Sequence, residues 1–280
     1  MENPFKYGGV VRGPYFADRE KEMNELKREM VNLNRVFLVS PRRFGKTCLL
    51  LNLIEMLKRD ATACAYIDLN AFPDIKSFAS ALTSLTSRAL ETNKDKLLKM
   101  FAGFQKLRPK VTVEPDGTIN AGLELAVDEK DALSALLEGM RHAEKLAAKK
   151  KRKLVVVIDE FSDLEKFNGP TIERALRSEI QKQTHIGYIF SGSEQSIMLA
   201  MIRDRTRAFY KLGRIMALEP IERGAYTGFV QKWLKKGGYT VDEDDLKRVA
   251  RGANFVNLLR SKYEVVRLDL AHSEDPCCNS

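Results

Sequence analysis

The sequence predicts an α/β fold built on a parallel five-stranded sheet, and two patterns support this prediction. Apolar segments of strand length alternate with amphipathic segments of helix length from residue 19 to about residue 220. Such alternation is typical of parallel strands joined by right-handed helical crossovers. The run Leu154–Ile158 is apolar and mostly β-branched, as expected of a strand that is buried on both faces.

The individual elements follow from periodicity and from turn residues. Residues 4–16 are too rich in Gly and Pro for a helix, and Asp18 is a candidate N-cap for the first helix. Strands are expected at residues 35–40, 64–70, 154–159, 186–191 and 214–218. Helices are expected at residues 19–33, 46–59, 74–92, 129–149, 171–183 and 194–203.

The chain is expected to divide near residue 220. Residues 1–220 would form the α/β domain, with a β-hairpin insertion at about 110–127 that turns at Pro115–Asp116–Gly117. Residues 221–270 would form a small helical lid, with helices at about 222–236, 242–251 and 254–266. Residues 271–280 are expected to be a disordered tail.

The composition of the 280-residue chain, 44% hydrophobic and 30% charged, is typical of globular proteins. No apolar run is long enough to cross a membrane, the N-terminus lacks the apolar core of a secretory signal, and the four cysteines suggest no disulfide framework. We therefore expect a cytoplasmic protein without membrane contact. The net charge of +9 and the basic cluster Lys149–Lys153 would suit a nucleic-acid partner, although solvated helix faces explain them too.

The stretch Ser40–Thr47 joins the first expected strand to the second expected helix and ends in Gly-Lys-Thr. This is the context of a phosphate-binding P-loop, in which backbone N–H groups and the helix N-terminus surround an anion. Lys46 would reach the β- and γ-phosphates of a nucleotide, and the Thr47 hydroxyl would be a ligand of Mg²⁺. The first glycine of the usual pattern is Ser40 here. The residues predicted to bind the nucleotide are Pro41, Arg42, Arg43, Phe44, Gly45, Lys46, Thr47 and Cys48; Cys48 is interpreted as a small core residue and not as a nucleophile.

Asp159 and Glu160 follow the most apolar strand, at the sheet edge where ligands of open α/β sheets gather. Asp159 is therefore a candidate to hold Mg²⁺, and Glu160 to orient or deprotonate an attacking water. Taken alone, two acids after a strand could simply face solvent. The P-loop earlier in the chain favours the catalytic interpretation.

Polar residues also follow the next strand. Ser193 could sense a γ-phosphate, or it could cap the following helix. Arg203, Arg205, Arg207 and Arg214 come next. One of them could act as an arginine finger, although surface or interface roles are the more usual ones for such residues.

Together these motifs resemble the AAA+-related ATPases of the STAND type, in particular the archaeal ATPase group. The matching features are Phe16–Met23, Pro41–Thr47, Ile158–Phe161 and Ser191–Ser193. The resemblance implies a strand order of 5-1-4-3-2, a helical lid and usually a C-terminal winged-helix domain, which the end of this sequence would leave out. It also implies that the segment before the first helix borders the adenine, so Val10, Val11 and Phe16 are candidate base contacts.

We therefore expect an ATP-binding, Mg²⁺-dependent ATPase in which Glu160, Lys46 and Ser193 serve catalysis and Thr47 and Asp159 organise the metal. The resemblance implies a slow nucleotide-driven molecular switch, with ATP and ADP as ligands and a protein partner or a second copy of the chain as its target. The alternative is a nucleotide-gated module that binds DNA or protein with negligible hydrolysis. A kinase would need an acceptor-binding signature, which the sequence does not show.

Overall fold

The structure is a computed structural model that describes residues 10–13, 16, 19–91, 107–113, 119–125 and 129–238. The chain divides into two units. One is Lys21–Glu219, and the other combines Met1–Glu20 with Pro220–Ser280.

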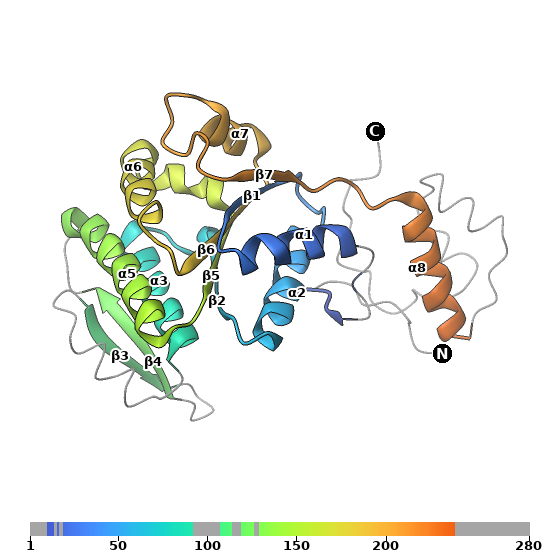
Figure 1. The fold of residues 1–280 in the computed structure, drawn as a ribbon, viewed down its shortest axis with the longest axis horizontal. Coiled ribbons are helices and arrows are strands. Elements are labelled where there is room, and N and C mark those ends of the chain that lie inside the picture. Colours follow the sequence, from blue (N-terminus) through green and yellow to red (C-terminus); the bar gives the residue numbers. More distant parts are fainter. Residues whose placement is uncertain are drawn as a thin grey trace. The chain divides into compact units, whose positions relative to one another are not determined.

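The larger unit is built on a parallel sheet with the strand order β2-β5-β6-β1-β7 (Figure 1). Read from the opposite edge, this is the predicted order 5-1-4-3-2, which the structure confirms. The central strands β5 and β6 are buried along their whole length, as their apolar sequences require. The five strands are β1 (Arg35–Val39), β2 (Ala63–Asp68), β5 (Leu154–Asp159), β6 (Ile186–Gly192) and β7 (Arg214–Ala217).

The helices of this unit lie close to their predicted positions. They are α1 (Glu20–Val31), α2 (Lys46–Arg59), α3 (Ile75–Leu90), α5 (Glu129–Lys150), α6 (Gly169–Ile180) and α7 (Gln195–Arg203). Short 3₁₀ helices, η2 (Leu69–Ala71) and η3 (Phe161–Phe167), follow β2 and β5, and neither was predicted from the sequence. The expected helices at 242–251 and 254–266, the Asp18 cap and the tail lie outside the described residues.

An aromatic cluster supports the carboxyl end of the sheet. Phe161, directly after the acids of β5, lies 4.5 Å from the Phe190 ring and 5.2 Å from the Phe209 ring, measured between centroids. Phe37 of β1 stacks on Phe190 at 4.9 Å. All four rings are buried. The cluster therefore holds the ends of β1, β5 and β6 at fixed positions behind the site described below.

Strands β3 (Leu107–Val113) and β4 (Ile119–Leu125) form a separate antiparallel sheet. In Figure 1 this hairpin lies beside α3 and α5, away from the five-stranded sheet, and β4 contacts α3. The predicted Pro-Asp-Gly turn falls outside the described residues.

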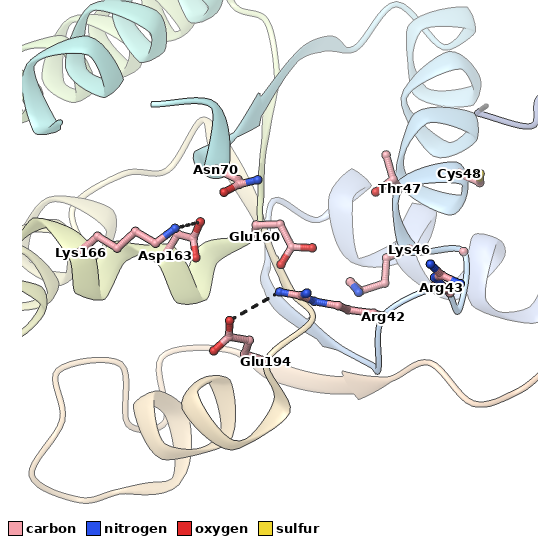
Figure 2. A pocket seen from close by; sticks show the side chains of 11 residues that line it. Arg42, Arg43, Lys46, Thr47, Cys48, Asn70, Glu160, Asp163, Lys166 and Glu194 are labelled. Atoms are coloured by element: carbon pink, nitrogen blue, oxygen red, sulfur yellow. Dashed lines mark hydrogen bonds and ion pairs between the residues drawn. The ribbon is translucent and has the colours of Figure 1, made fainter. Parts of the chain in front are cut away.

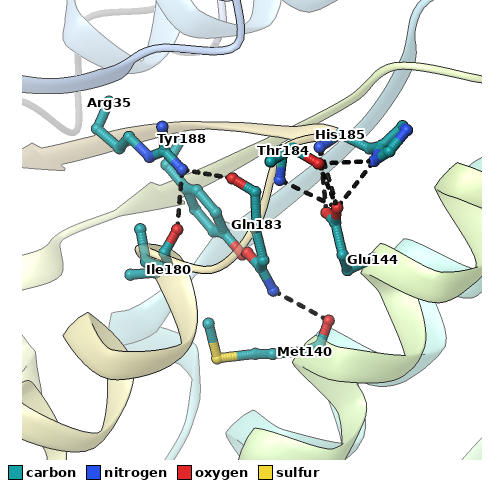
Figure 3. A network of polar contacts seen from close by, with 8 residues as sticks. All are labelled: Arg35, Met140, Glu144, Ile180, Gln183, Thr184, His185 and Tyr188. Atoms are coloured by element: carbon teal, nitrogen blue, oxygen red, sulfur yellow. Dashed lines mark hydrogen bonds and ion pairs between the residues drawn. The ribbon is translucent and has the colours of Figure 1, made fainter.

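The turn between α6 and β6 is fastened to α5 by Glu144 (Figure 3). Its carboxylate accepts hydrogen bonds from the backbone N–H groups of Thr184 (3.0 Å) and His185 (3.1 Å). The His185 Nδ1 atom lies 2.8 Å from the same carboxylate. One half-buried acid therefore satisfies several donors at the entrance to a central strand.

A second group of contacts beside it ties the turn to the sheet (Figure 3). The Gln183 side chain donates to the Met140 carbonyl at 3.1 Å and accepts from the Tyr188 hydroxyl at 2.6 Å. Arg35, at the start of β1, donates to the carbonyls of Ile180 (2.8 Å) and Gln183 (2.7 Å). Burial raises the pKa of Tyr188, so its hydroxyl stays protonated and remains a donor.

In the smaller unit the described helix is α8 (Arg223–Lys236), within the region expected to form the lid. Val230, Trp233 and Leu234 are buried, and the Lys236 ammonium lies 4.5 Å from the centre of the Trp233 ring. Across the described ranges, no helix combines the length and the apolar character needed to cross a membrane.

Candidate functional site

The loop between β1 and α2 turns sharply at two residues with left-handed backbone conformations. Gly45, the N-cap of α2, has a φ of 82°, and Arg43 has a φ of 68°. Glycine suits position 45 because residues with a Cβ atom disfavour this left-handed conformation. Ser40 stands where the usual motif has glycine. Its φ is not positive, so its backbone conformation does not require glycine. Its N–H lies 3.5 Å from the Gly192 carbonyl and links the loop to β6.

A cavity of about 560 Å³ lies at the carboxyl ends of the strands, in front of this loop (Figure 2). This is the position where open α/β sheets bind their ligands. The described residues that line it are Arg42, Arg43, Gly45, Lys46, Thr47, Cys48, Asn70, Glu160, Asp163, Lys166 and Glu194. Basic residues come mainly from the loop, and acidic residues from the strand ends facing it.

Lys46 is the buried cation of the site. Its ammonium donates to the carbonyls of Ser40 (3.4 Å) and Pro41 (3.3 Å), within its own loop. Burial lowers the pKa of Lys46, while the negative charges of Glu160 and Asp159 act in the opposite direction. Both loop bonds are long, so an anion in the cavity could replace them.

Asp159 joins three elements. Its Oδ2 atom accepts from the Thr47 hydroxyl at 2.9 Å and from the Tyr66 hydroxyl at 2.8 Å. Its Oδ1 atom accepts from the Glu160 N–H at 3.1 Å. Only 2% of Asp159 is exposed. Burial and the adjacent charge of Asp159 raise the pKa of Tyr66, which therefore stays protonated and can donate.

Glu160 adopts a left-handed conformation with a φ of 49°. Its Oε2 atom accepts from both the N–H (3.1 Å) and the hydroxyl (2.7 Å) of Ser193. The alternative role of Ser193 as a helix cap is wrong, because Glu194 occupies the N-cap position of α7 and Ser193 directs its hydroxyl to Glu160. The sequence-predicted residues Glu160 and Ser193 are therefore in direct contact.

Arg42 lies at the solvent side of the cavity. Its guanidinium is 3.8 Å from the Glu194 carboxylate, and 78% of its side-chain surface is exposed. In Figure 2 its side chain extends from the loop toward Glu194, on the side of the cavity where Lys46 and Glu160 also lie. A long, exposed ion pair of this kind contributes little to stability, so Arg42 is available to a ligand.

The structure does not unite every predicted residue. Val10, Val11 and Phe16 belong to the smaller unit, so their predicted contacts with a base stay predictions. Pro41 and Phe44 belong to the loop but do not line the cavity; Cys48 lines it and is half-buried.

Several residues of the site were missed from sequence. Tyr66 reaches Asp159 because β2 pairs with β5, where Asp68 is level with Asp159. The polar residues Asp68 and Asn70 at the end of β2 were the available signal, since the carboxyl ends of parallel strands meet at one edge. Burial raises the pKa of Asp68, and the neighbouring negative charges of Asp159 and Glu160 add to this effect.

Two of the four candidate arginine fingers form ion pairs with acidic residues. Arg207 is paired with Glu173 and with Glu165, and Glu173 is fully buried. Burial lowers the pKa of Arg207, but its bond to Glu173 raises it by more, so the net pKa is raised and the residue stays charged. Arg214 is paired with Glu25 and Glu29 of α1. Arg203 and Arg205 are exposed.

Comparison with solved structures supports the same fold. The chain resembles the Walker-type ATPase of Pyrococcus abyssi (15% identity, TM-score 0.61), with 89% of this chain and 66% of that chain covered. It also resembles the Aeropyrum pernix ORC1 protein in complex with DNA (13%, TM-score 0.54, 87% and 55% covered) and the Aeropyrum pernix ORC2 protein in its ADP form (12%, TM-score 0.51, 89% and 60% covered). The chain therefore spans less than two thirds of the length of the two Aeropyrum proteins and just under two thirds of the Pyrococcus protein.

The search of curated proteins found no match. A family model, described as an ATPase domain predominantly from Archaea, matches residues 16–251. This match includes the loop, Asp159, Glu160 and Ser193. The chain therefore belongs to this family of predominantly archaeal ATPase domains.

Proposed function

We propose that the chain binds ATP together with Mg²⁺ in the 560 Å³ cavity and hydrolyses it slowly, acting as a nucleotide-driven molecular switch. Membership of an ATPase family supports nucleotide-dependent chemistry. The observation that carries the proposal for this site is the 2.9 Å bond from Thr47 to Asp159, with Glu160 next in the chain.

The residues around Asp159 fit a magnesium ion. The Thr47 hydroxyl and the Asp159 carboxylate are hard oxygen ligands, and their 2.9 Å separation lets them share one ion. Among the described residues no group of three or more His, Cys, Asp or Glu could hold a metal. Mg²⁺ would therefore complete its shell with water and phosphate oxygens, and we expect it to bind with the nucleotide. When bound, it would supply positive charge that stabilises the phosphate oxygens.

The triphosphate would lie against the loop amides and the N-terminus of α2. Lys46 would exchange its long bonds to the Ser40 and Pro41 carbonyls for phosphate oxygens. Arg42 would leave Glu194 and contact the outermost phosphate, because an exposed guanidinium binds phosphate more strongly than it binds a carboxylate 3.8 Å away. Arg43, in the same loop, also lines the cavity.

Hydrolysis requires a water that attacks the γ-phosphorus. As its oxygen forms the new P–O bond, the bond to the β–γ bridging oxygen breaks and ADP departs with that electron pair. Glu160 would accept the proton of the water and later release it to solvent. Ser193 occupies only the Oε2 atom of Glu160, so Oε1 can receive this proton.

Substitution of two loop residues tests the site. Lys46→Ala should weaken ATP binding by about tenfold or more, since it removes a charge-assisted contact to phosphate. Thr47→Ala should leave nucleotide binding without metal nearly unchanged but reduce the gain in affinity on adding Mg²⁺. Both are measured by titration with a fluorescent ATP analogue. Arg59→Ala, on the far end of α2, is the control. Normal ATP binding by Lys46→Ala would refute the site assignment.

A nucleotide-gated module that binds DNA or protein with negligible hydrolysis is the second candidate. The contact between Ser193 and Glu160 favours it, because both Ser193 donors occupy one of the two carboxylate oxygens of the proposed base. A DNA partner is suggested by the net charge of +9 and by the DNA in the structure of the Aeropyrum ORC1 protein.

A further inference from the structure

Strand β2 is the outermost strand on its side of the five-stranded sheet, as far as the described strands go. The Ala63 N–H donates to the Lys153 carbonyl, toward β5. Successive residues of a strand turn their backbone groups to opposite edges, so Ala63 and Ala65 face β5. Cys64 and Tyr66 then direct their N–H and C=O groups to the outer edge, which is a template for a further strand.

A second cavity, of about 520 Å³, follows this outer edge. Its floor is Thr62–Tyr66, and its sides come from the last turn of α2 (Lys58), the last turns of α3 (Leu85 and Arg88) and Arg152. We call it the β2 groove. Ala61, Ala63, Ala65 and Ala89 also line it, and their small side chains leave room for those of a partner. It shares no lining residue with the nucleotide cavity.

The charge of the groove is of one sign. Lys58, Arg88 and Arg152 line it, and none of its described lining residues is acidic. Arg152 is held in place by the carbonyls of Ala61 (3.4 Å) and Leu90 (3.4 Å). The pKa of the Cys64 thiol is raised to about 11 by burial, which the charges of Lys58 and Arg152 only partly oppose. Cys64 therefore adds no negative charge to the groove.

We propose that the β2 groove binds an extended, acidic segment of a partner protein, which adds to the sheet as a strand beside β2. Backbone pairing would supply affinity, and the three cations would select acidic side chains. The floor spans five positions, enough for a partner strand of about five residues, since a strand rises about 3.3 Å per residue. An open strand edge offers alternating donors and acceptors, which match a polypeptide and not the phosphates of a nucleic acid. This inference does not depend on the nucleotide site.

Amide hydrogen exchange measured by NMR on the full chain tests the proposal. The probe is an end-blocked peptide of alternating glutamate and valine, compared with its lysine–valine counterpart. We expect the acidic peptide to slow exchange at Cys64 and Tyr66, whose N–H groups face outward, and not at Ala63 and Ala65, which already face β5. The basic peptide should have no effect.

Charge reversal provides the matched variants. The double variant of Lys58→Glu and Arg88→Glu should weaken binding of the acidic peptide by about tenfold or more, because like charges would then face each other. Arg59→Glu, on the same turn of α2 but outside the groove, should bind normally.

Four results would overturn the proposal. Protection by both peptides alike would show that charge does not select the partner. Lack of alternating protection at millimolar acidic peptide would show that no strand adds here. Self-association of the double variant without peptide binding would show that the cations only protect an exposed edge. Binding of a single-stranded oligonucleotide in place of the acidic peptide would assign the groove to nucleic acid.

Discussion

Arg42 makes weaker contacts with acidic residues than two other arginines of the chain do. Arg207 and Arg214, further along the chain, each contact two acids. Arg42 has one long ion pair with Glu194, at the mouth of a cavity that also contains Lys46. The free energy needed to release Arg42 is therefore small, and a γ-phosphate would give it a stronger partner.

Substitution of Arg42 should change the affinity for ATP more than the affinity for ADP. We expect Arg42→Ala to lower ATP affinity by about 10- to 100-fold, while ADP affinity changes little. This range corresponds to about 1.4–2.8 kcal/mol, as expected for loss of a charge-assisted hydrogen bond. Glu194→Gln should strengthen ATP binding, since it removes the competing carboxylate. Calorimetric titration with each nucleotide measures both effects. Equal losses for ATP and ADP would place Arg42 elsewhere on the nucleotide.

The basic cluster after α5 has a structural role for several of its members. Lys150 is paired with Glu91 at 2.5 Å, and Lys153 donates to the Val31 carbonyl at 2.6 Å. Arg152 contacts backbone carbonyls, as described for the β2 groove. Arg152 and Lys153 satisfy backbone carbonyls where helices end, a role that the sequence could not distinguish from a nucleic-acid patch.

At the scale of elements, Glu144 holds α5 to the turn before β6. Burial raises the pKa of Glu144, but hydrogen bonds from Thr184 and His185 together outweigh this effect and lower it below its ordinary value. The ionised form is therefore stabilised in the folded chain. It contributes to the free energy of unfolding above the unfolded-state pKa, near 4.5, and this contribution is lost as pH falls through the folded-state pKa.

The pH dependence of stability tests this element. At pH 7, Glu144→Gln should lower the free energy of unfolding by about 1–3 kcal/mol, because the donors of Thr184 and His185 lose a charged acceptor. The difference from the wild-type chain should shrink as pH falls below about 4.5. Urea titrations at several pH values measure it. Since the His185 Nδ1 atom lies 2.8 Å from the Glu144 carboxylate, the series is repeated with His185→Gln. A difference that is constant from pH 7 to pH 3 would contradict this account.

At the scale of the whole molecule, the parallel sheet was predictable because strands and helices alternate regularly. The order of the strands followed from the family resemblance and was confirmed. The pairing of residues across strands could not be predicted. Tyr66 contacts Asp159 only because β2 and β5 pair in one particular register, and a shift by one residue would turn Tyr66 to the other face.

The candidate site was predictable to the extent that its residues belong to local motifs. Lys46 and Thr47 follow a loop of recognisable spacing, and Asp159 and Glu160 end an unmistakably buried strand. Glu194 was missed because its contact with Arg42 joins segments far apart in sequence. The helix η3 was missed because a left-handed residue, Glu160, starts it, and no local pattern signals that conformation for a glutamate.

The central claim is that Glu160 acts as the general base in ATP hydrolysis, and one comparison tests it most directly. Single-turnover ATP hydrolysis is measured with Mg²⁺ for the wild-type chain and for Glu160→Gln, with ATP affinity determined in parallel. The account predicts that hydrolysis slows by about 10²- to 10⁴-fold, the usual contribution of a general base, while ATP affinity stays within a few-fold. Equal hydrolysis rates at equal affinity would contradict it and favour a binding module with negligible turnover.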